Sequence, residues 1–248
     1  MGSEQTASKA NDVLSRIQRE LNELFNTVND VLSSNVAQFL LPDWILEKIK
    51  ALLKKVERLI NKFIDKVQKY LALPGMSDVL RQAGSKWDAQ VGGDARANED
   101  DVNSQKMKVY DYWRGNAARS YQTTLDTQNS TYDDFAKLTR EAKGWLERAA
   151  AAIEEFWDMV VIAGVSLAAG IGTCIGACAT GVGTPAGLAA LVVGVLGAIG
   201  AIVLAANSYE NSAGTIKEAM SQMKAQKTST TFNNGWPQAT TTGGWKAD

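Results

Sequence analysis

The chain has 248 residues, with 26 Lys and Arg against 27 Asp and Glu, and a formal net charge of −1. This balance gives no general reason to expect a nucleic-acid partner. The absence of histidine removes the commonest general base and a common metal ligand, and no phosphate-binding loop or nucleophile motif is present. We therefore expect that the protein is not an enzyme and that it binds no metal or cofactor.

Two amphipathic helices are predicted in residues 1–75. Hydrophobic residues recur at steps of three and four across roughly residues 9–35, and the pattern resumes after Pro42, where Asp43 can cap a second helix. A Leu-Pro-Gly sequence at 73–75 marks the end of that helix. The apolar face of the first helix consists of Val13, Leu14, Ile17, Leu21, Leu24, Phe25, Val28, Val31 and Leu32. We interpret this segment as an N-terminal amphipathic helical hairpin.

The second of these helices has a basic face. Eight Lys and Arg residues lie between Asp43 and Tyr70, against four acidic residues. A basic amphipathic helix can lie on an anionic membrane. The alternative is that the apolar faces of the two helices bury each other or a third helix. The basic residues are Lys48, Lys50, Lys54, Lys55, Arg58, Lys62, Lys66 and Lys69.

A second helical hairpin is predicted over residues 76–157. Gly92 and Gly93 weaken a single helix through its first part, so we expect a broken or kinked helix that ends near Tyr112. Gly115 can adopt the positive φ that terminates a helix, and the residues after it keep the three-four rhythm throughout. Because no helix breaker follows, the second helix of this hairpin is expected to continue into an apolar segment.

The longest uncharged apolar stretch lies between Asp158 and Glu210. Its two halves, residues 159–180 and 186–207, are each about 33 Å long at about 1.5 Å per residue, close to the ~30 Å hydrocarbon thickness of a bilayer. We therefore predict a hydrophobic, transmembrane-type helical hairpin over residues 158–209. The turn between its halves is marked by Gly181, Gly183 and Pro185.

Small and aromatic residues suggest how this hairpin makes contacts. Small residues at four-residue spacing let helices approach closely in lipid, so we expect the two spans to pack on each other or on further copies. Trp157 and Tyr209 stand at the open end of the hairpin, where interfacial aromatic anchors are found in membranes. The alternative is a core hairpin of a soluble bundle, covered by the rest of the chain. The small residues are Ala168, Gly172, Gly176, Ala190, Gly194 and Ala198.

Residues 210–248 are predicted to form a short helix and a flexible tail that is poor in aliphatic side chains. Trp236 and Trp245 are unusual in such a tail, and the sequence assigns them no role. The predicted fold class is all-α, with elongated helical hairpins and a two-span hydrophobic helical hairpin.

Trp113, Arg114 and Gly115 lie between two predicted helices and follow an aromatic-rich approach at 109–112. This arrangement resembles the turn of the WXG (Trp-x-Gly) family, small helical hairpins exported by type VII secretion systems. The resemblance covers residues 78–157. It implies that Trp113 and Gly115 engage export machinery or a helical partner of the same family.

The chain departs from the family in its export signal, a Tyr followed four positions later by an acid. Tyr132 is followed at that distance by Ala136, and Tyr209 by Ala213. Export would then depend on a partner that carries the signal, or would not occur.

From these features we predict a type VII secretion-associated protein that inserts into membranes. The most specific form of this prediction is a secreted pore-forming or membrane-perturbing toxin. The expected partners are a lipid bilayer, a helical WXG partner or the export machinery, and further copies of the chain. The alternatives are a two-span membrane anchor or scaffold of the producing cell, and a soluble helical bundle with a buried hydrophobic hairpin.

Overall fold

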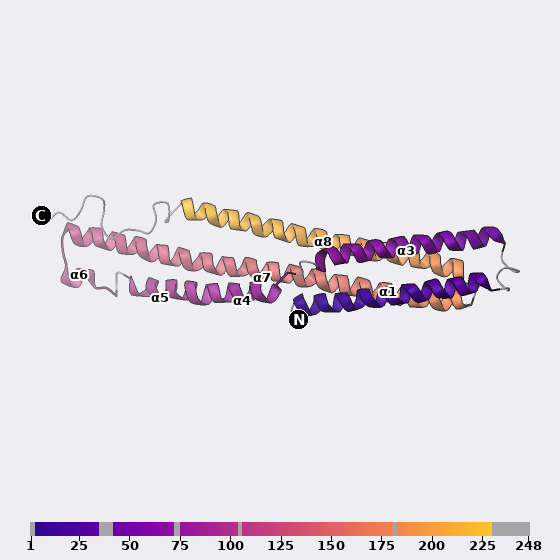
Figure 1. The fold of residues 1–248 in the computed structure, drawn as a ribbon. Coiled ribbons are helices and arrows are strands. Elements are labelled where there is room, and N and C mark those ends of the chain that lie inside the picture. The colour runs from indigo at the N-terminus through magenta and orange to yellow at the C-terminus, as the bar shows by residue number, and fades with distance from the viewer. Residues whose placement is uncertain (1–2, 35–41, 72–74, 104–105, 181–182, 230–248) are drawn as a thin grey trace. The chain divides into compact units, whose positions relative to one another are not determined.

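The computed structural model describes residues 3–34, 42–71, 75–103, 106–180 and 183–229, and every regular element within them is a helix. This confirms the predicted all-α fold class and the pairing of two long apolar helices in a hairpin. The elements in chain order are α1 (Ser3–Ser33), α3 (Asp43–Leu71), α4 (Ser77–Lys86), the π-helix η1 (Trp87–Gly92), α5 (Gly93–Asp101), α6 (Val109–Tyr112), α7 (Asn116–Ala179) and α8 (Thr184–Ser229) (Figure 1). The chain divides into two compact units: unit 1 is Met1–Ser77 with Ala151–Asn211, and unit 2 is Asp78–Ala150 with Ser212–Asp248.

Unit 1 contains α1, α3, the C-terminal part of α7 and the N-terminal part of α8, which lie side by side (Figure 1). The apolar faces of these four segments meet in one core. The sequence segments 1–75 and 158–209, which are far apart along the chain, therefore bury hydrophobic surface in the same unit. The largest fully buried side chains of this core are Ile17, Leu24, Val28, Ile49, Val56, Ile60, Phe63, Val67, Trp157, Ile171, Leu188 and Ile202.

Helix α3 begins directly after Pro42 and ends at Leu71. The carbonyl oxygen of Pro42 accepts hydrogen bonds from the backbone N–H groups of Ile45 and Leu46, at 2.9 and 3.3 Å. After α3, Gly75 has a φ of 77°, a conformation that glycine adopts without the steric cost of a side chain.

Helix α8 begins at the predicted turn and is longer than expected. Pro185 lies in its first turn, where the missing N–H removes no helical hydrogen bond. The carbonyl of Gly183 accepts a hydrogen bond from the N–H of Gly187 at 2.9 Å. The short helix predicted after Tyr209 is the continuation of α8, because no Pro or helix-terminating Gly follows the apolar stretch. Gly181, Trp236 and Trp245 lie outside the described residues.

Unit 2 contains an antiparallel helical hairpin. A Cβ built on Gly84 of α4 would lie 3.3 Å from the Cα of Lys143 in α7. Further along, the Nδ2 of Asn129 in α7 donates a hydrogen bond to the carbonyl of Glu99 in α5, at 2.7 Å. Residue numbers rise along α4 and α5 while those of the contacting α7 residues fall, so the two sides of the hairpin run in opposite directions.

The first side of this hairpin is broken before Tyr112, as predicted, but the break does not fall at the glycine pair Gly92-Gly93. The segment Trp87–Gly92 forms a π turn that continues directly into α5, and the break falls between α5 and α6. A Cβ on Gly92 would collide with the hydroxyl of Thr139 on α7, whereas Gly93 has nothing within 4 Å. The first glycine therefore permits a close approach of two helices and does not end a helix.

Candidate membrane-contacting surface

Helices α7 and α8 each contain a segment long and apolar enough to cross a membrane. The core helix of a soluble protein can pass the same test, but such a helix is mostly buried. Only 39% of the apolar window of α7 and 44% of that of α8 are buried. More than half of each apolar window is therefore left uncovered.

Large aliphatic side chains project from this uncovered part. Ile162 on α7 is 66% exposed, and Val193 and Leu204 on α8 are 70% and 69% exposed. Val165 and Leu196 are also exposed. No charged residue interrupts the row, because the chain has none between Asp158 and Glu210. We call the five aliphatic residues Ile162, Val165, Val193, Leu196 and Leu204 the apolar face.

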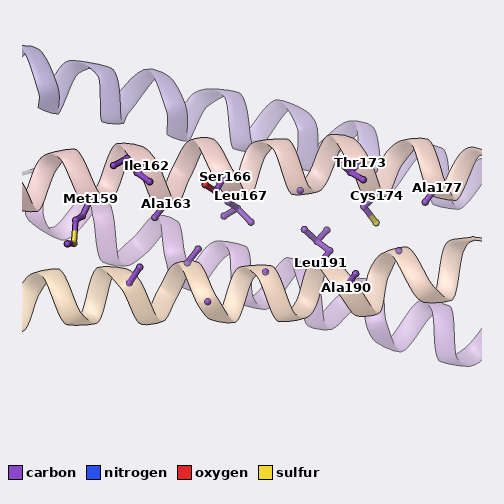
Figure 2. A pocket seen from close by; sticks show the side chains of 16 residues that line it. Met159, Ile162, Ala163, Ser166, Leu167, Thr173, Cys174, Ala177, Ala190 and Leu191 are labelled. Atoms are coloured by element: carbon purple, nitrogen blue, oxygen red, sulfur yellow. The ribbon is translucent and has the colours of Figure 1, made fainter.

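An apolar groove of about 660 Å³ runs between α7 and α8. Figure 2 shows Leu167 and Leu191 pointing toward each other from the two helices across it. Small residues contact the facing helix: a Cβ on Gly170 would lie 3.7 Å from Leu191 Cδ1, and one on Gly187 would lie 3.2 Å from the Cβ of Ala177. Polar atoms in the groove are few and uncharged, as in Ser166 and Thr173, so it suits a hydrocarbon surface.

The opposite side of α7 is covered by α1 and α3. Gly164 faces α1 so closely that a Cβ there would lie 2.5 Å from Val13 Cγ1 and 3.8 Å from Ile17 Cδ1. On α3, the ring of Tyr70 makes an edge contact with Phe156 of α7, with centroids 4.8 Å apart. The two amphipathic helices therefore bury one side of the hydrophobic hairpin and leave its apolar face free.

An aromatic cluster closes the open end of the hairpin. Phe156 lies 5.1 Å from Trp157 and 6.1 Å from Tyr209 between ring centroids. Trp157, expected at a membrane interface together with Tyr209, is 1% exposed and belongs to the core of this arrangement. An interfacial position for these two rings stays a prediction for a membrane-bound state.

The small residues predicted to pack the hairpin fall into three groups. Ala190, Gly194 and Ala198 of α8 line the groove that α8 shares with α7. Ala168 of α7 is fully buried. The remaining two, Gly172 and Gly176, are exposed, with nothing within 4 Å of a Cβ built on either one.

The close contacts that the structure shows at the hairpin were not predicted. They involve Gly164, Gly170 and Gly187, which share no four-residue spacing with one another. At the turn, Gly183 is needed because a Cβ there would lie 2.7 Å from the carbonyl oxygen of Ala177.

The two cysteines lie on one side of α7, inside the bundle. Their sulfur atoms are 3.8 Å apart, well beyond the length of a disulfide bond, and both thiols are free. The Thr184 hydroxyl donates to the carbonyl of Cys178 at 3.4 Å. Cys174 and Cys178 thus pack next to the hairpin turn as small side chains.

The Trp-x-Gly sequence forms the turn between α6 and α7 of unit 2. Gly115 has a φ of 102°, and its carbonyl accepts the first backbone hydrogen bond of α7, from Arg119 at 3.2 Å. The ring of Trp113 is 39% exposed and lies 5.7 Å from the ring of Tyr121 on α7. The turn therefore presents a partly exposed tryptophan whose ring contacts α7.

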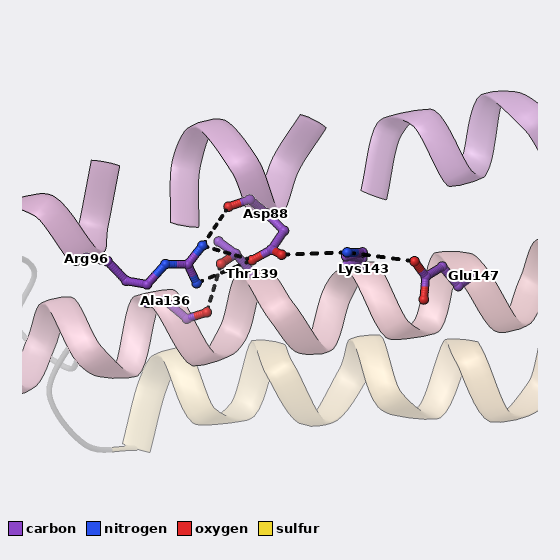
Figure 3. A network of polar contacts seen from close by, with 6 residues as sticks. All are labelled: Asp88, Arg96, Ala136, Thr139, Lys143 and Glu147. Carbon is purple, nitrogen blue, oxygen red and sulfur yellow. Dashed lines mark hydrogen bonds and ion pairs between the residues drawn. The ribbon is translucent and has the colours of Figure 1, made fainter. Parts of the chain in front are cut away.

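Ion pairs hold the two sides of unit 2 together. The carboxylate of Asp88 in η1 accepts from Arg96 of α5 at 3.4 Å and lies 3.8 Å from the ammonium of Lys143 on α7 (Figure 3). Lys143 also faces Glu147 one turn further along α7. At the surface of the same unit, a hydrogen bond from Lys137 to Asp133 raises the pKa of the lysine. Arg96, Lys137 and Lys143 of unit 2 thus have carboxylate partners.

No protein-family model matches the chain, and neither a curated protein nor a solved structure matches it. The resemblance to the WXG family therefore rests on Trp113, Gly115 and the residues around them.

Proposed function

We propose that the protein inserts into lipid bilayers through the hydrophobic hairpin of α7 and α8. The observation that carries this proposal is the apolar face, which lies in an uncharged stretch long enough to span a bilayer. Monomeric soluble proteins rarely leave large contiguous apolar patches exposed, and such patches often mark protein or membrane contacts. In a bilayer the same side chains would contact acyl chains.

The cover formed by α1 and α3 gives the protein a state in which it can exist outside a membrane. A helix of 22 residues that is apolar on all sides must be buried in protein or in lipid. Here protein covers one side, and insertion would replace that cover by lipid. This two-state scheme fits a protein that meets its membrane after folding.

Gly194→Arg tests the insertion directly. Gly194 is exposed and a Cβ built there meets nothing within 4 Å, so we expect the folded bundle to accept a larger side chain at this position. In a span, that charge near the middle costs about 2.5–3.5 kcal/mol on insertion scales. We expect the wild-type chain to float with liposomes and to resist a high-salt wash, and the variant to be lost from the floated fraction.

Gly214→Arg is the matched control. Gly214 also lies in α8 with open space around it, but beyond the apolar stretch. We expect this variant to float like the wild-type chain. A wild-type protein that stays in the dense fraction as a monomer without detergent would reject insertion and favour the soluble bundle.

We further propose that the hairpin of unit 2 serves type VII export or pairing with a WXG-like helix. The exposed Trp113 at a glycine turn between antiparallel helices supports this role. The pore-forming effector and the membrane anchor are distinguished by whether the bound protein makes vesicles leak.

A further inference from the structure

Helix α3 carries a line of lysines that make no ion pair among the described residues. Lys48, Lys55, Lys62 and Lys66 recur at steps of seven and four, so they share one side of the helix. The first three are exposed and Lys66 is half-buried. We call these four lysines the basic strip.

The apolar side of α3 already has its partners, because it is buried in the core of unit 1. Ile49, Val56 and Phe63 on that side are fully buried. The basic strip therefore lies on the part of α3 that the core of unit 1 leaves accessible.

The lysines of the basic strip lack carboxylate partners. Among the residues that the structure describes, none of the four makes an ion pair, although Glu47 and Asp65 lie on the same helix near the strip. In unit 2, by contrast, Lys137 and Lys143 each face a carboxylate. Unpaired cations arranged in a line are available to an external anion.

A tryptophan extends the strip at the start of α3. Trp44 precedes Lys48 by one turn, on the same side of the helix, and is 64% exposed. Tryptophan is enriched where an apolar phase meets water, since its ring is amphipathic. Lysines next to an exposed tryptophan match a surface of anionic headgroups above acyl chains better than they match the uniformly polar backbone of a nucleic acid.

We propose that Trp44 and the basic strip dock the closed protein on anionic lipid bilayers before the hairpin inserts. The inference rests on the proposed insertion for its place in the sequence of events, but docking is a separate and measurable step. Docking is electrostatic, so salt releases it. Insertion is hydrophobic and survives a salt wash.

Docking is measured at low salt in the Gly194→Arg background, which suppresses insertion. The two probes are phosphatidylcholine vesicles and vesicles of equimolar phosphatidylcholine and phosphatidylglycerol. We expect binding to the anionic vesicles only. Lys55→Gln with Lys62→Gln should lower that partition coefficient roughly thirtyfold, because each lysine near an anionic surface contributes about 1 kcal/mol.

Two matched controls accompany the test. Lys86→Gln with Arg140→Gln removes the same charge from exposed positions of unit 2, and Trp87→Ala removes a half-exposed tryptophan there. We expect neither control to change docking, whereas Trp44→Ala should weaken it.

Several outcomes overturn the proposal. The first is equal binding to both kinds of vesicle, and the second is an equal loss of vesicle binding in the unit 2 charge control. The third is binding of short duplex DNA that is as tight as binding of the anionic vesicles and is lost in the same α3 variant. Salt-releasable docking without any salt-resistant wild-type protein would keep this inference and reject insertion. Salt-resistant insertion that is unchanged by the lysine substitutions would keep insertion and reject this inference.

Discussion

Val13 of α1 lies against the backbone of Gly164 in α7, where a Cβ would be 3.7 Å from the Cβ of Val13. This is a close contact between the amphipathic cover and the hydrophobic hairpin. The separation falls within the 3.5–4.5 Å between the Cβ atoms of a disulfide. The pair can therefore be used to lock the cover in place.

Val13→Cys with Gly164→Cys, in a chain whose native cysteines are replaced by alanine, should block insertion when oxidised. The disulfide keeps α1 on α7, so lipid cannot replace protein around that helix. Flotation with a salt wash measures the loss, and a reducing agent should restore insertion.

The control staple for this experiment lies in unit 2. Gly84→Cys with Leu146→Cys has a Cβ separation of 3.4 Å, near the lower limit for a disulfide. We expect its oxidised form to insert normally. If the oxidised variant with cysteines at positions 13 and 164 inserted as well as its reduced form, insertion would not require α1 to separate from α7.

Gly164→Leu should loosen the cover without any crosslink. The new side chain displaces Val13, and overpacking of this kind typically costs about 1–3 kcal/mol. We expect a lower free energy of unfolding in urea and faster insertion into vesicles. Val13→Ala in the same chain should recover part of the stability, since it removes the displaced methyl groups.

Gly172→Leu is the counterpart of that variant on the exposed side of α7. Open space surrounds Gly172, and helix propensity improves by roughly 0.8–1.0 kcal/mol when glycine is replaced by a good helix former. Stability should stay equal or rise. If Gly172→Leu destabilised the protein as much as Gly164→Leu does, the contact with Val13 would not be the cause of the destabilisation at Gly164.

The helices could be predicted from the sequence because each buries one face, and burial imposes a three-four period on α1 and α3. The register between neighbouring helices could not be predicted from the sequence. The predicted stripe Ala168, Gly172 and Gly176 uses a four-residue step, which advances about 40° around an α-helix each time. Ala168 is therefore buried while Gly176 faces outward, and residues on another line, such as Gly170, meet α8.

A covered hairpin was one of the alternatives that the sequence left open, but neither the helices that form the cover nor the π turn was predicted. Amphipathic patterns show that α1 and α3 need an apolar partner, and that partner includes parts of α7 and α8 that are far away in the sequence. At Gly92 the sequence shows a weak helix former, whereas the reason for glycine is the Thr139 hydroxyl on a different helix. Such reasons depend on tertiary packing, which local propensity does not contain.

Gly92→Ala should destabilise unit 2 because its Cβ collides with Thr139. We expect a loss of about 1–3 kcal/mol in the free energy of unfolding, with vesicle insertion unchanged. Gly93→Ala, with nothing within 4 Å, should stabilise by roughly 0.5–1 kcal/mol. Thr139→Ala should rescue Gly92→Ala, and a failure of that rescue would argue against the collision.

Trp113→Ala with Gly115→Ala should impair export or partner pairing and leave vesicle binding intact, because the turn is not part of the hydrophobic hairpin. Alanine at the positive φ of Gly115 costs on the order of 1–2 kcal/mol, so Gly115→Ala alone serves as the control for strain. Secretion into the medium and co-purification with a WXG partner are the measurements. An equal loss of export and vesicle binding would make the turn merely structural.

The last prediction separates a pore from an anchor. Two apolar helices enclose no channel, so dye release requires several copies, and its rate should rise more steeply than linearly with protein concentration. Gly172→Leu with Gly176→Leu should suppress release from anionic vesicles while flotation persists, because bulk prevents close packing between copies and hydrophobicity is kept.

We expect the folded bundle to tolerate both of these substitutions, since a Cβ built on either glycine meets nothing within 4 Å. A loss of release would therefore report on contacts formed in the membrane. Gly144→Leu, at a position of α7 in unit 2 where a Cβ also meets nothing within 4 Å, is the control and should release dye like the wild-type chain. Vesicles that bind the wild-type protein and stay sealed at every concentration would leave the anchor as the function.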